Sequence, residues 1–242
     1  MRELSSSAEF PSAKRAHPAL QLDSAALLSL LRWVSPTLPV GAYAYSRGLE
    51  QAVTAGWVHD EASALAWILG VLRHGVGQLD VPVLARLHEA YTQGSPSRVE
   101  HWNDYLGATR ESRELALEDE QMGQAFLRVL KTTFPGEQWM SDRAPSYVTM
   151  FARAATLSHV PILATLLGFL WATGESQVSA AVRLIPLGQS AAQRMLAALS
   201  VELPAIAAQA AALGDEELGS ALPALALASA RHETQYTRLF RS

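Results

Sequence analysis

Histidine is the residue type in this chain best suited to bind a metal ion or to transfer protons. The seven histidines are His17, His59, His74, His88, His101, His159 and His232. A helical zinc site places two imidazoles four residues apart so that both face one ion, and no pair here has that spacing. The sequence predicts no local metal site, and each histidine alone is more typical of a surface or hydrogen-bonded core residue. A site assembled from distant histidines stays open.

Carboxylates are the next candidates, because the run Glu118-Asp119-Glu120 could supply the paired acids of acid–base catalysis. Consecutive positions on a helix point in different directions, however, so the run is more typical of a solvent-exposed helix face. We therefore predict that these side chains are solvated.

Motifs for phosphate binding and nucleophilic catalysis are absent from the sequence. Neither the phosphate loop G-x-x-x-x-G-K-[ST] nor the nucleophile elbow G-x-S-x-G occurs. Gly70, Gly75 and Gly77 lie in a helical pattern with no lysine after them, which indicates helix packing or bending. The sequence thus predicts no catalytic residue, no directly bound cofactor and no metal ligand.

Composition narrows the class of protein further. The formal net charge is −4 and no block of five Lys or Arg occurs, which excludes nucleic acid and anionic membrane as expected partners. There are no cysteines, which fits a cytoplasmic location. The long apolar run at residues 160–173 is shorter than the ~20 residues of a membrane span, so we expect a core helix. With 49% hydrophobic and 17% charged residues, part of the surface is expected to be covered by partners.

Helical periodicity runs along most of the chain, with Asp23 and Asp60 placed as N-caps. The predicted helices cover residues 25–34, 47–55, 62–78, about 82–92, 98–131 as one helix or two, 146–157, 160–172, 177–185, 190–203 and 204–213. Alternation of period two is missing, so a sheet is not expected. The prediction is an all-α, single-domain bundle of roughly 9–11 helices without significant sheet. Residues 1–22 are interpreted as a flexible tail, 23–230 as the helical domain and 231–242 as a partner-binding tail.

Two internal stretches differ from an ordinary helical core. Residues 38–50 (LPVGAYAYSRGLE) contain turn-forming Pro and Gly among aromatic residues, which predicts an ordered, partly buried connection between helices. In residues 177–193, Arg183 is the only charge. Burying an unpaired arginine costs several kcal/mol, so Arg183 must reach solvent or find a partner.

The C-terminal tail (residues 231–242) has a third unusual pattern. Tyr236, Leu239 and Phe240 would share one face of a helical turn. Burying them stabilises the tail by about 1.5–3 kcal/mol each, whereas ordering ~10 residues costs about 1–2 kcal/mol apiece. We therefore expect the tail to fray alone and to be ordered by a partner protein.

From about residue 27 to residue 242 the chain resembles the urease accessory protein UreF family. Four motifs carry the resemblance, and only their combination is specific. They are LPVGAYAYSRGLEQAVTAGWV at residues 38–58, RELALEDEQMG at 113–123, VSAAVRLIPLGQSAAQ at 178–193 and ASARHETQYTRLFRS at 228–242. The resemblance implies a homodimeric all-α protein that binds the UreD (also called UreH) scaffold and the GTPase UreG. In that complex it would support nickel delivery to apo-urease, with the nickel handled by the complex.

The resemblance also assigns candidate partner-binding residues. In the third motif these are Arg183, Gln189 and Gln193, associated with the GTPase-facing surface. In the first motif they are Tyr43, Tyr45 and Glu50. In the terminal motif, linked to the scaffold protein, they are Arg231, His232, Glu233, Tyr236, Arg238, Leu239, Phe240 and Arg241.

Two alternative functions and one mechanistic question stay open. The first alternative is a helical enzyme with a non-local active site around His74, His88 or Glu118. The second is a structural interaction protein unrelated to nickel. Within the UreF interpretation, Arg183 would either restrain GTP hydrolysis or complete the GTPase site as an arginine finger.

Overall fold

The computed structural model describes residues 22–139, 143–220 and 222–242. The predicted flexible segment 1–22 therefore lies, except for Leu22, outside the described residues. Within the described ranges the chain forms ten α-helices and no strand, so the all-α prediction is confirmed. The helices are α1 (Ser24–Trp33), α2 (Leu49–Thr54), α3 (Glu61–Val71), α4 (Asp80–Thr92), α5 (Pro96–Thr109), α6 (Arg113–Thr133), α7 (Tyr147–Leu157), α8 (Ile162–Leu184), α9 (Gln189–Ala212) and α10 (Pro223–His232).

Side-chain caps begin several of these helices where the sequence places them. The Asp23 carboxylate accepts a hydrogen bond from the Ala26 amide at 2.7 Å, and Asp60 forms a capping box with Ser63 at the start of α3. The predicted segment 98–131 is two helices, because Ser112 caps α6 through the Leu115 amide at 3.1 Å. Local polar residues therefore set these boundaries.

Two predicted breaks are wrong, and one helix was missed. Segments 160–172 and 177–185 form the single helix α8, in which Gly174 permits close packing: a Cβ there would lie 2.9 Å from Leu199 of α9. Segments 190–203 and 204–213 form α9, which continues through Pro204. Buried neighbours such as Leu203 and Ile206 hold the helix together there, although Pro204 donates no backbone hydrogen bond. Helix α10 was not predicted.

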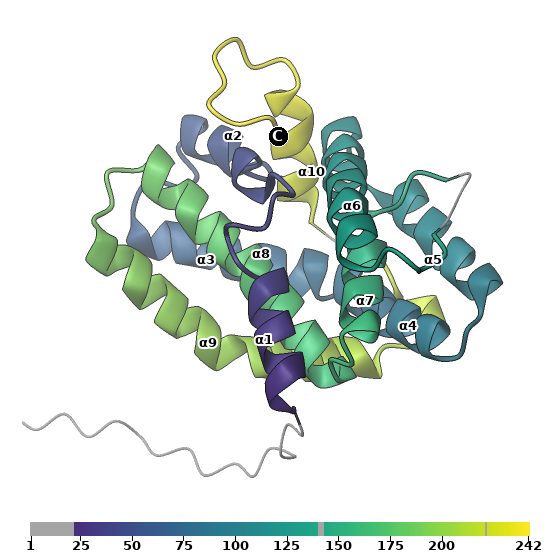
Figure 1. Ribbon diagram of the computed structural model, residues 1–242. Helices are drawn as coiled ribbons and strands as arrows, with labels where there is room; N and C mark the ends of the chain where they lie inside the picture. Colours follow the sequence, from purple (N-terminus) through teal and green to yellow (C-terminus); the bar gives the residue numbers. More distant parts are fainter. Residues whose placement is uncertain (1–21, 140–142, 221) are drawn as a thin grey trace, which may run out of the picture.

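The core surrounds α8, which contacts α1, α2, α3, α4, α7 and α9 (Figure 1). Its Phe169 stacks edge-on against Phe151 of α7, with ring centroids 5.3 Å apart. Trp33 at the end of α1 meets Phe126 of α6 at 5.7 Å. One continuous apolar cluster thus links helices from the whole described length.

Glycines allow close contacts at two further places. Residues Leu72–Val76 form a π-helical turn after α3, and a Cβ at Gly77 would lie 2.7 Å from the Leu72 carbonyl oxygen. The prediction of packing or bending is therefore confirmed for Gly75, inside this turn, and for Gly77, whereas a Cβ at Gly70 would meet no atom within 4 Å. On α6, a Cβ at Gly123 would lie 2.0 Å from the carbonyl oxygen of Pro145, so the segment before α7 lies directly against the α6 backbone.

Helix α9 is long and apolar enough to cross a membrane by length and composition, which are weak evidence for a single helix. A third (33%) of its most apolar window is buried. In the structure α9 packs along α8 as part of the helical body (Figure 1).

Replacing Gly123 by Ala is expected to lower the free energy of unfolding by about 1–3 kcal/mol, because Pro145 must move away from α6. Chemical denaturation followed by circular dichroism measures the change. Gly107→Ala is the control, since a Cβ on that α5 residue meets no atom within 4 Å. It should raise the free energy of unfolding by about 0.5–1 kcal/mol through helix propensity. Equal effects of the two substitutions would contradict the close contact.

Candidate functional site

The C-terminal tail returns to the helical body and ends between α2 and α6, beside the helix α10 from which it leaves (Figure 1). Four side chains of the body receive it, and we call this group the tail seat: Ser46, Glu50, Glu114 and Glu118. The seat joins three of the motifs identified in the sequence, because Ser46 and Glu50 belong to the first, Glu114 and Glu118 to the second, and the tail to the fourth.

Glu50 makes more contacts with the tail than any other residue of the seat. Its carboxylate accepts backbone hydrogen bonds from Leu239 at 2.7 Å and Phe240 at 2.9 Å, and a side-chain bond from Gln235 at 3.3 Å. The residue is only 6% exposed, so these donors replace the water that would otherwise solvate the charge. Glu50 lies in the first turn of α2, two residues after Gly48.

The backbone at Gly48 explains how α2 approaches α10. Gly48 has φ +75°, a conformation that glycine adopts without strain. A Cβ at this position would lie 3.2 Å from Ala228 of α10. The glycine thus allows both the turn before α2 and the close packing that brings Glu50 under the tail.

His232 at the end of α10 bridges two carboxylates. Its Nε2 lies 3.2 Å from Glu50 and its Nδ1 lies 2.8 Å from Glu114, and the residue is completely buried. Both ring nitrogens therefore lie within hydrogen-bond distance of a carboxylate oxygen. Arg238 adds a cation, with Nη1 2.8 Å from the other oxygen of Glu114.

Ser242 anchors the far end of the tail. Its hydroxyl donates to Glu118 at 2.6 Å, and its carbonyl oxygen accepts from the amide and the hydroxyl of Ser46 at 2.7 and 2.6 Å. Glu118 is also paired with Arg47, whose Nε lies 2.6 Å from it. The loop before α2 and the tail are therefore fixed by the same carboxylate.

The prediction of a solvated acidic run is wrong for two of its three members. Glu118 and Asp119 are 2% and 4% exposed. The two side chains point to different sides of α6, as expected, but both sides are buried. Asp119 accepts from the Tyr147 amide at 3.0 Å and pairs with Arg110 at 3.1 Å. Burial raises the pKa of Asp119, although the Arg110 charge acts in the opposite direction.

The tail itself differs from its predicted form. Tyr236, Leu239 and Phe240 do not share a helical face, because α10 ends at His232 and the residues beyond it are not helical. Phe240 is 5% exposed, whereas Tyr236 and Leu239 project into solvent at 103% and 65%. Hydrogen bonds to other parts of the same chain hold the tail in place, rather than contacts with a partner protein. The free energy expected from burying three apolar side chains was too small to order the tail because it left out the charge-assisted hydrogen bonds to Glu50, Glu114 and Glu118.

The candidate residues from the sequence fall into three groups. Buried members hold the tail or the loop and are Tyr45, Glu50, His232 and Phe240. Exposed members at or near the tail seat are Tyr43, Arg183, Arg231, Glu233, Tyr236, Arg238, Leu239 and Arg241. Gln189 and Gln193 are exposed on α9 and make no hydrogen bond or ion pair with the seat among the described residues.

Arg183 connects the third motif to the other stretches. Its Nη1 donates to the Tyr43 carbonyl oxygen at 3.2 Å, and its guanidinium lies 5.9 Å from the ring centroid of Phe240. Arg183 reaches solvent, which is one of the two expected outcomes, and it is also tethered within its own chain. All four motif stretches therefore meet around the tail seat.

Sequence reasoning missed several residues of this arrangement. They are Ser46, Arg47, Glu114, Glu118 and Ser242. A usable signal was the spacing of Glu114 and Glu118, which places two carboxylates on one face of α6. The same face carries the buried Leu115 and Met122, so this stripe was partly apolar and could have been recognised as inward-facing.

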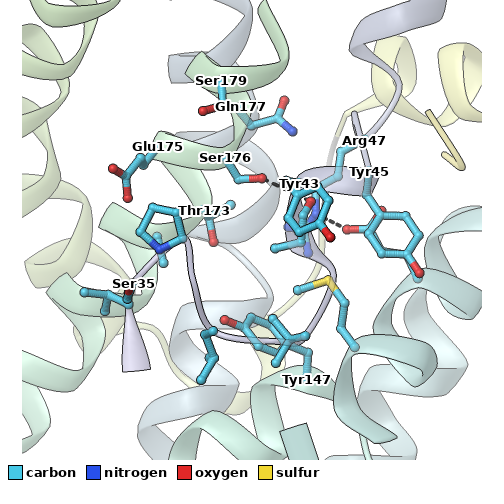
Figure 2. Close-up of a pocket in the computed structure, with 18 of the residues that line it drawn as sticks. Ser35, Tyr43, Tyr45, Arg47, Tyr147, Thr173, Glu175, Ser176, Gln177 and Ser179 are labelled. Carbon is cyan, nitrogen blue, oxygen red and sulfur yellow. Dashed lines mark hydrogen bonds and ion pairs between the residues drawn. The ribbon is translucent and has the colours of Figure 1, made fainter. Parts of the chain in front are cut away.

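A cavity of about 80 Å³ lies between the α1–α2 loop and α8. In Figure 2, Ser35 and Glu175 lie at one end of it, Tyr45 and Arg47 at the other, and Tyr147 below. The predicted ordered connection at residues 38–50 is confirmed, since Leu38, Val40 and Tyr45 are buried. We call this space the loop cavity.

The residues proposed for an enzyme site have separate surroundings. His74 is exposed, His88 lies 2.9 Å from the carbonyl oxygen of Val160, and Glu118 pairs with Arg47. Burial lowers the pKa of His88. In the described part of the chain, no group of three or more His, Asp or Glu is placed to hold a metal ion. These residues do not assemble into one site.

Comparison with known proteins assigns the family. A model of the UreF family matches residues 58–200. The urease accessory protein UreF of Teredinibacter turnerae is 49% identical over 217 residues, which cover 89% of this chain and 98% of that protein. The chain belongs to the UreF family. The UreF protein of Chromohalobacter salexigens is 47% identical, with 93% and 98% covered, and that of Marinobacter nauticus is 47% identical, with 90% and 94% covered.

UreF membership confirms the family resemblance drawn from the four motifs. The matched segment 58–200 contains the second and third motifs and the middle of the helical body. It excludes the tail and most of the first motif, so the tail seat joins residues from inside and outside the matched segment.

Replacing Glu50 by Gln is expected to loosen the tail of this UreF protein. A hydrogen bond to a charged group contributes about 1.5–3 kcal/mol, which corresponds to about 10- to 100-fold in an opening equilibrium. Amide hydrogen exchange should therefore accelerate by about that factor at Leu239 and Phe240. Glu120→Gln, a change on the outer side of α6, should leave both amides protected. Unchanged protection in Glu50→Gln would show that the carboxylate does not hold the tail.

Proposed function

We propose that this chain acts in urease maturation by binding other accessory proteins rather than by catalysing a reaction. One observation carries the proposal: the tail seat gathers all four motif stretches and leaves apolar and cationic side chains exposed beside it. We call these exposed residues the docking face: Tyr43, Arg183, Tyr236 and Leu239.

The residue types of the docking face support binding to protein. Tyr236, Leu239 and Tyr43 are 103%, 65% and 58% exposed, although large apolar side chains are usually buried. Aromatic residues and arginine are also the types that contribute most at protein interfaces. Because the chain itself orders the tail, a partner meets a prearranged surface and less entropy is lost on binding.

The partners follow from the family resemblance. We propose that the tail binds the UreD/UreH scaffold protein and that the Arg183 side binds the GTPase UreG, within a complex that acts on apo-urease. The chain would work as a homodimer in the cytoplasm, without nucleic acid or membrane as a partner. Nickel would be cargo of the complex, and no ligand set for it is assigned to this chain.

A protein without a catalytic role can still regulate a GTPase, provided that it binds one nucleotide state more tightly than the other. The tether of Arg183 to the Tyr43 carbonyl oxygen favours a fixed contact residue, since the guanidinium is already oriented. An arginine finger would instead reach into the GTPase site and stabilise the transition state. Removing the Arg183 side chain distinguishes the two roles, because the rate of GTP hydrolysis rises if Arg183 restrains the GTPase and falls if Arg183 is an arginine finger.

The double substitution Tyr236→Ala, Leu239→Ala is expected to weaken the complex with the scaffold protein by at least about tenfold, because truncating the few residues that anchor an interface costs about 2 kcal/mol or more. Co-purification and titration calorimetry measure the affinity, and nickel per urease measures maturation. Thermal stability should not change, since both side chains are exposed. Val201→Ala, an equally exposed apolar residue on α9, is the control. Full affinity in the double variant would contradict a docking role for the tail.

Replacing Arg183 by Ala should change the GTP hydrolysis rate of UreG in the complex. A higher rate identifies a restraining contact, and a rate lower by about 10³-fold or more identifies an arginine finger. Arg194→Ala is the matched control, because Arg194 is also exposed but pairs with Glu61 of α3. Unchanged GTPase activity together with unchanged nickel content of urease would remove Arg183 from the mechanism.

A further inference from the structure

The loop cavity contains hydrogen-bond acceptors for which the chain supplies no donor. Glu175 of α8 lines it and has no ion pair or hydrogen bond in the described part of the chain. Burial alone raises the pKa of this carboxyl group. Gln177 is only 1% exposed. Its Nε2 donates to the backbone carbonyl oxygen of Ser46 at 3.0 Å, while its Oε1 has no partner among the described residues. Gln177 Oε1 is thus a buried acceptor without a partner, and Glu175 is a partly buried carboxylate without an ion pair, so a ligand with donors would be stabilised here.

The rest of the lining is mostly apolar. Trp33, Leu38, Val40 and Met122 form much of the wall. Arg47, the one cation among the described lining residues, pairs with Glu118 at 2.6 Å and therefore does not serve Glu175. A ligand that fits has an apolar stem and a positively charged donor group, which is the chemistry of an arginine or lysine side chain.

The surroundings of the cavity indicate that this group belongs to a protein. Leu28 and Leu31 on α1 are 68% and 55% exposed, and the same helix ends at Trp33, which lines the cavity together with the nearby Ser35. Tyr43, 58% exposed, borders the cavity on the other side. Exposed apolar residues close to a cavity that holds a carboxylate without an ion pair are typical of a protein-binding surface, whereas a free small cation would not require them.

We propose that the loop cavity receives an arginine side chain from a partner protein, with the guanidinium at Glu175 and the stem against the apolar wall. The proposal rests on the partner-binding function proposed above and adds a second contact to it. Arginine is favoured over lysine because its guanidinium is planar, weakly hydrated and able to donate to two acceptors.

A titration of the full chain with n-butylguanidinium tests the ligand chemistry. Methyl NMR signals of Met122 and Leu38 should shift on binding, and the dissociation constant should be at least five times lower than for the neutral n-pentanol. In Glu175→Gln this preference should disappear. Glu216→Gln, the same charge change at an exposed site, should retain it. Equal affinity for the two probes, or an unchanged preference in Glu175→Gln, would overturn the proposal.

A second arm tests whether a protein supplies the side chain. Glu175→Arg should weaken the complex with the accessory partners at least tenfold, while Glu216→Arg should not. If the guanidinium probe binds but Glu175→Arg leaves the complex unchanged, the protein source is overturned and the proposed function stands. If even the wild-type chain captures no accessory partner, the proposed function fails and the protein source fails with it, while the probe titration still decides the ligand chemistry.

Discussion

The structure depends on one buried charge, the carboxylate of Glu50. A carboxylate that is only 6% exposed is destabilising unless donors replace its water, and here every donor comes from the C-terminal tail or the end of α10. The tail therefore stabilises the helical body by solvating its buried carboxylate, and the body in turn holds the tail in place. Removing the tail would leave Glu50 and Glu114 without the partners described above and Glu118 with Arg47 alone. The division at residue 230 is thus not a structural boundary, since α10 continues to His232.

Helix α6 connects this interaction to the core because its acidic residues face two sides. Glu114 and Glu118 face the tail, and Asp119 faces Arg110 and the start of α7. Gly123, one turn further, brings the same helix against the segment before α7. A motif that looked like a solvated surface is therefore a structural element that holds the tail on one side and the core on the other.

Local patterns predicted what local interactions determine. The helical period gave the all-α class, and Asp23 and Asp60 marked helix starts that the structure confirms. Gly174 and Pro204 misled the prediction because packing between α8 and α9 overrides their local preference. The terminal motif was recognised as important, yet its conformation was not predictable from spacing: Glu50 and Phe240 are 190 positions apart, and neither residue alone indicates the other. Long-range pairing of polar groups was the missing information.

The ordered tail also bears on how a chain without a known reactive group could influence other proteins. A flexible tail would bind at an entropic cost and adapt to several partner conformations. A tail fixed at Glu50 and Ser242 presents Tyr236 and Leu239 in one arrangement, so it fits one partner conformation better than others. Selective binding of this kind is what shifts a two-state partner such as a GTPase, because a ligand with equal affinity for both states shifts nothing. The rigidity produced by one buried carboxylate is therefore the property on which a regulatory role by binding would depend.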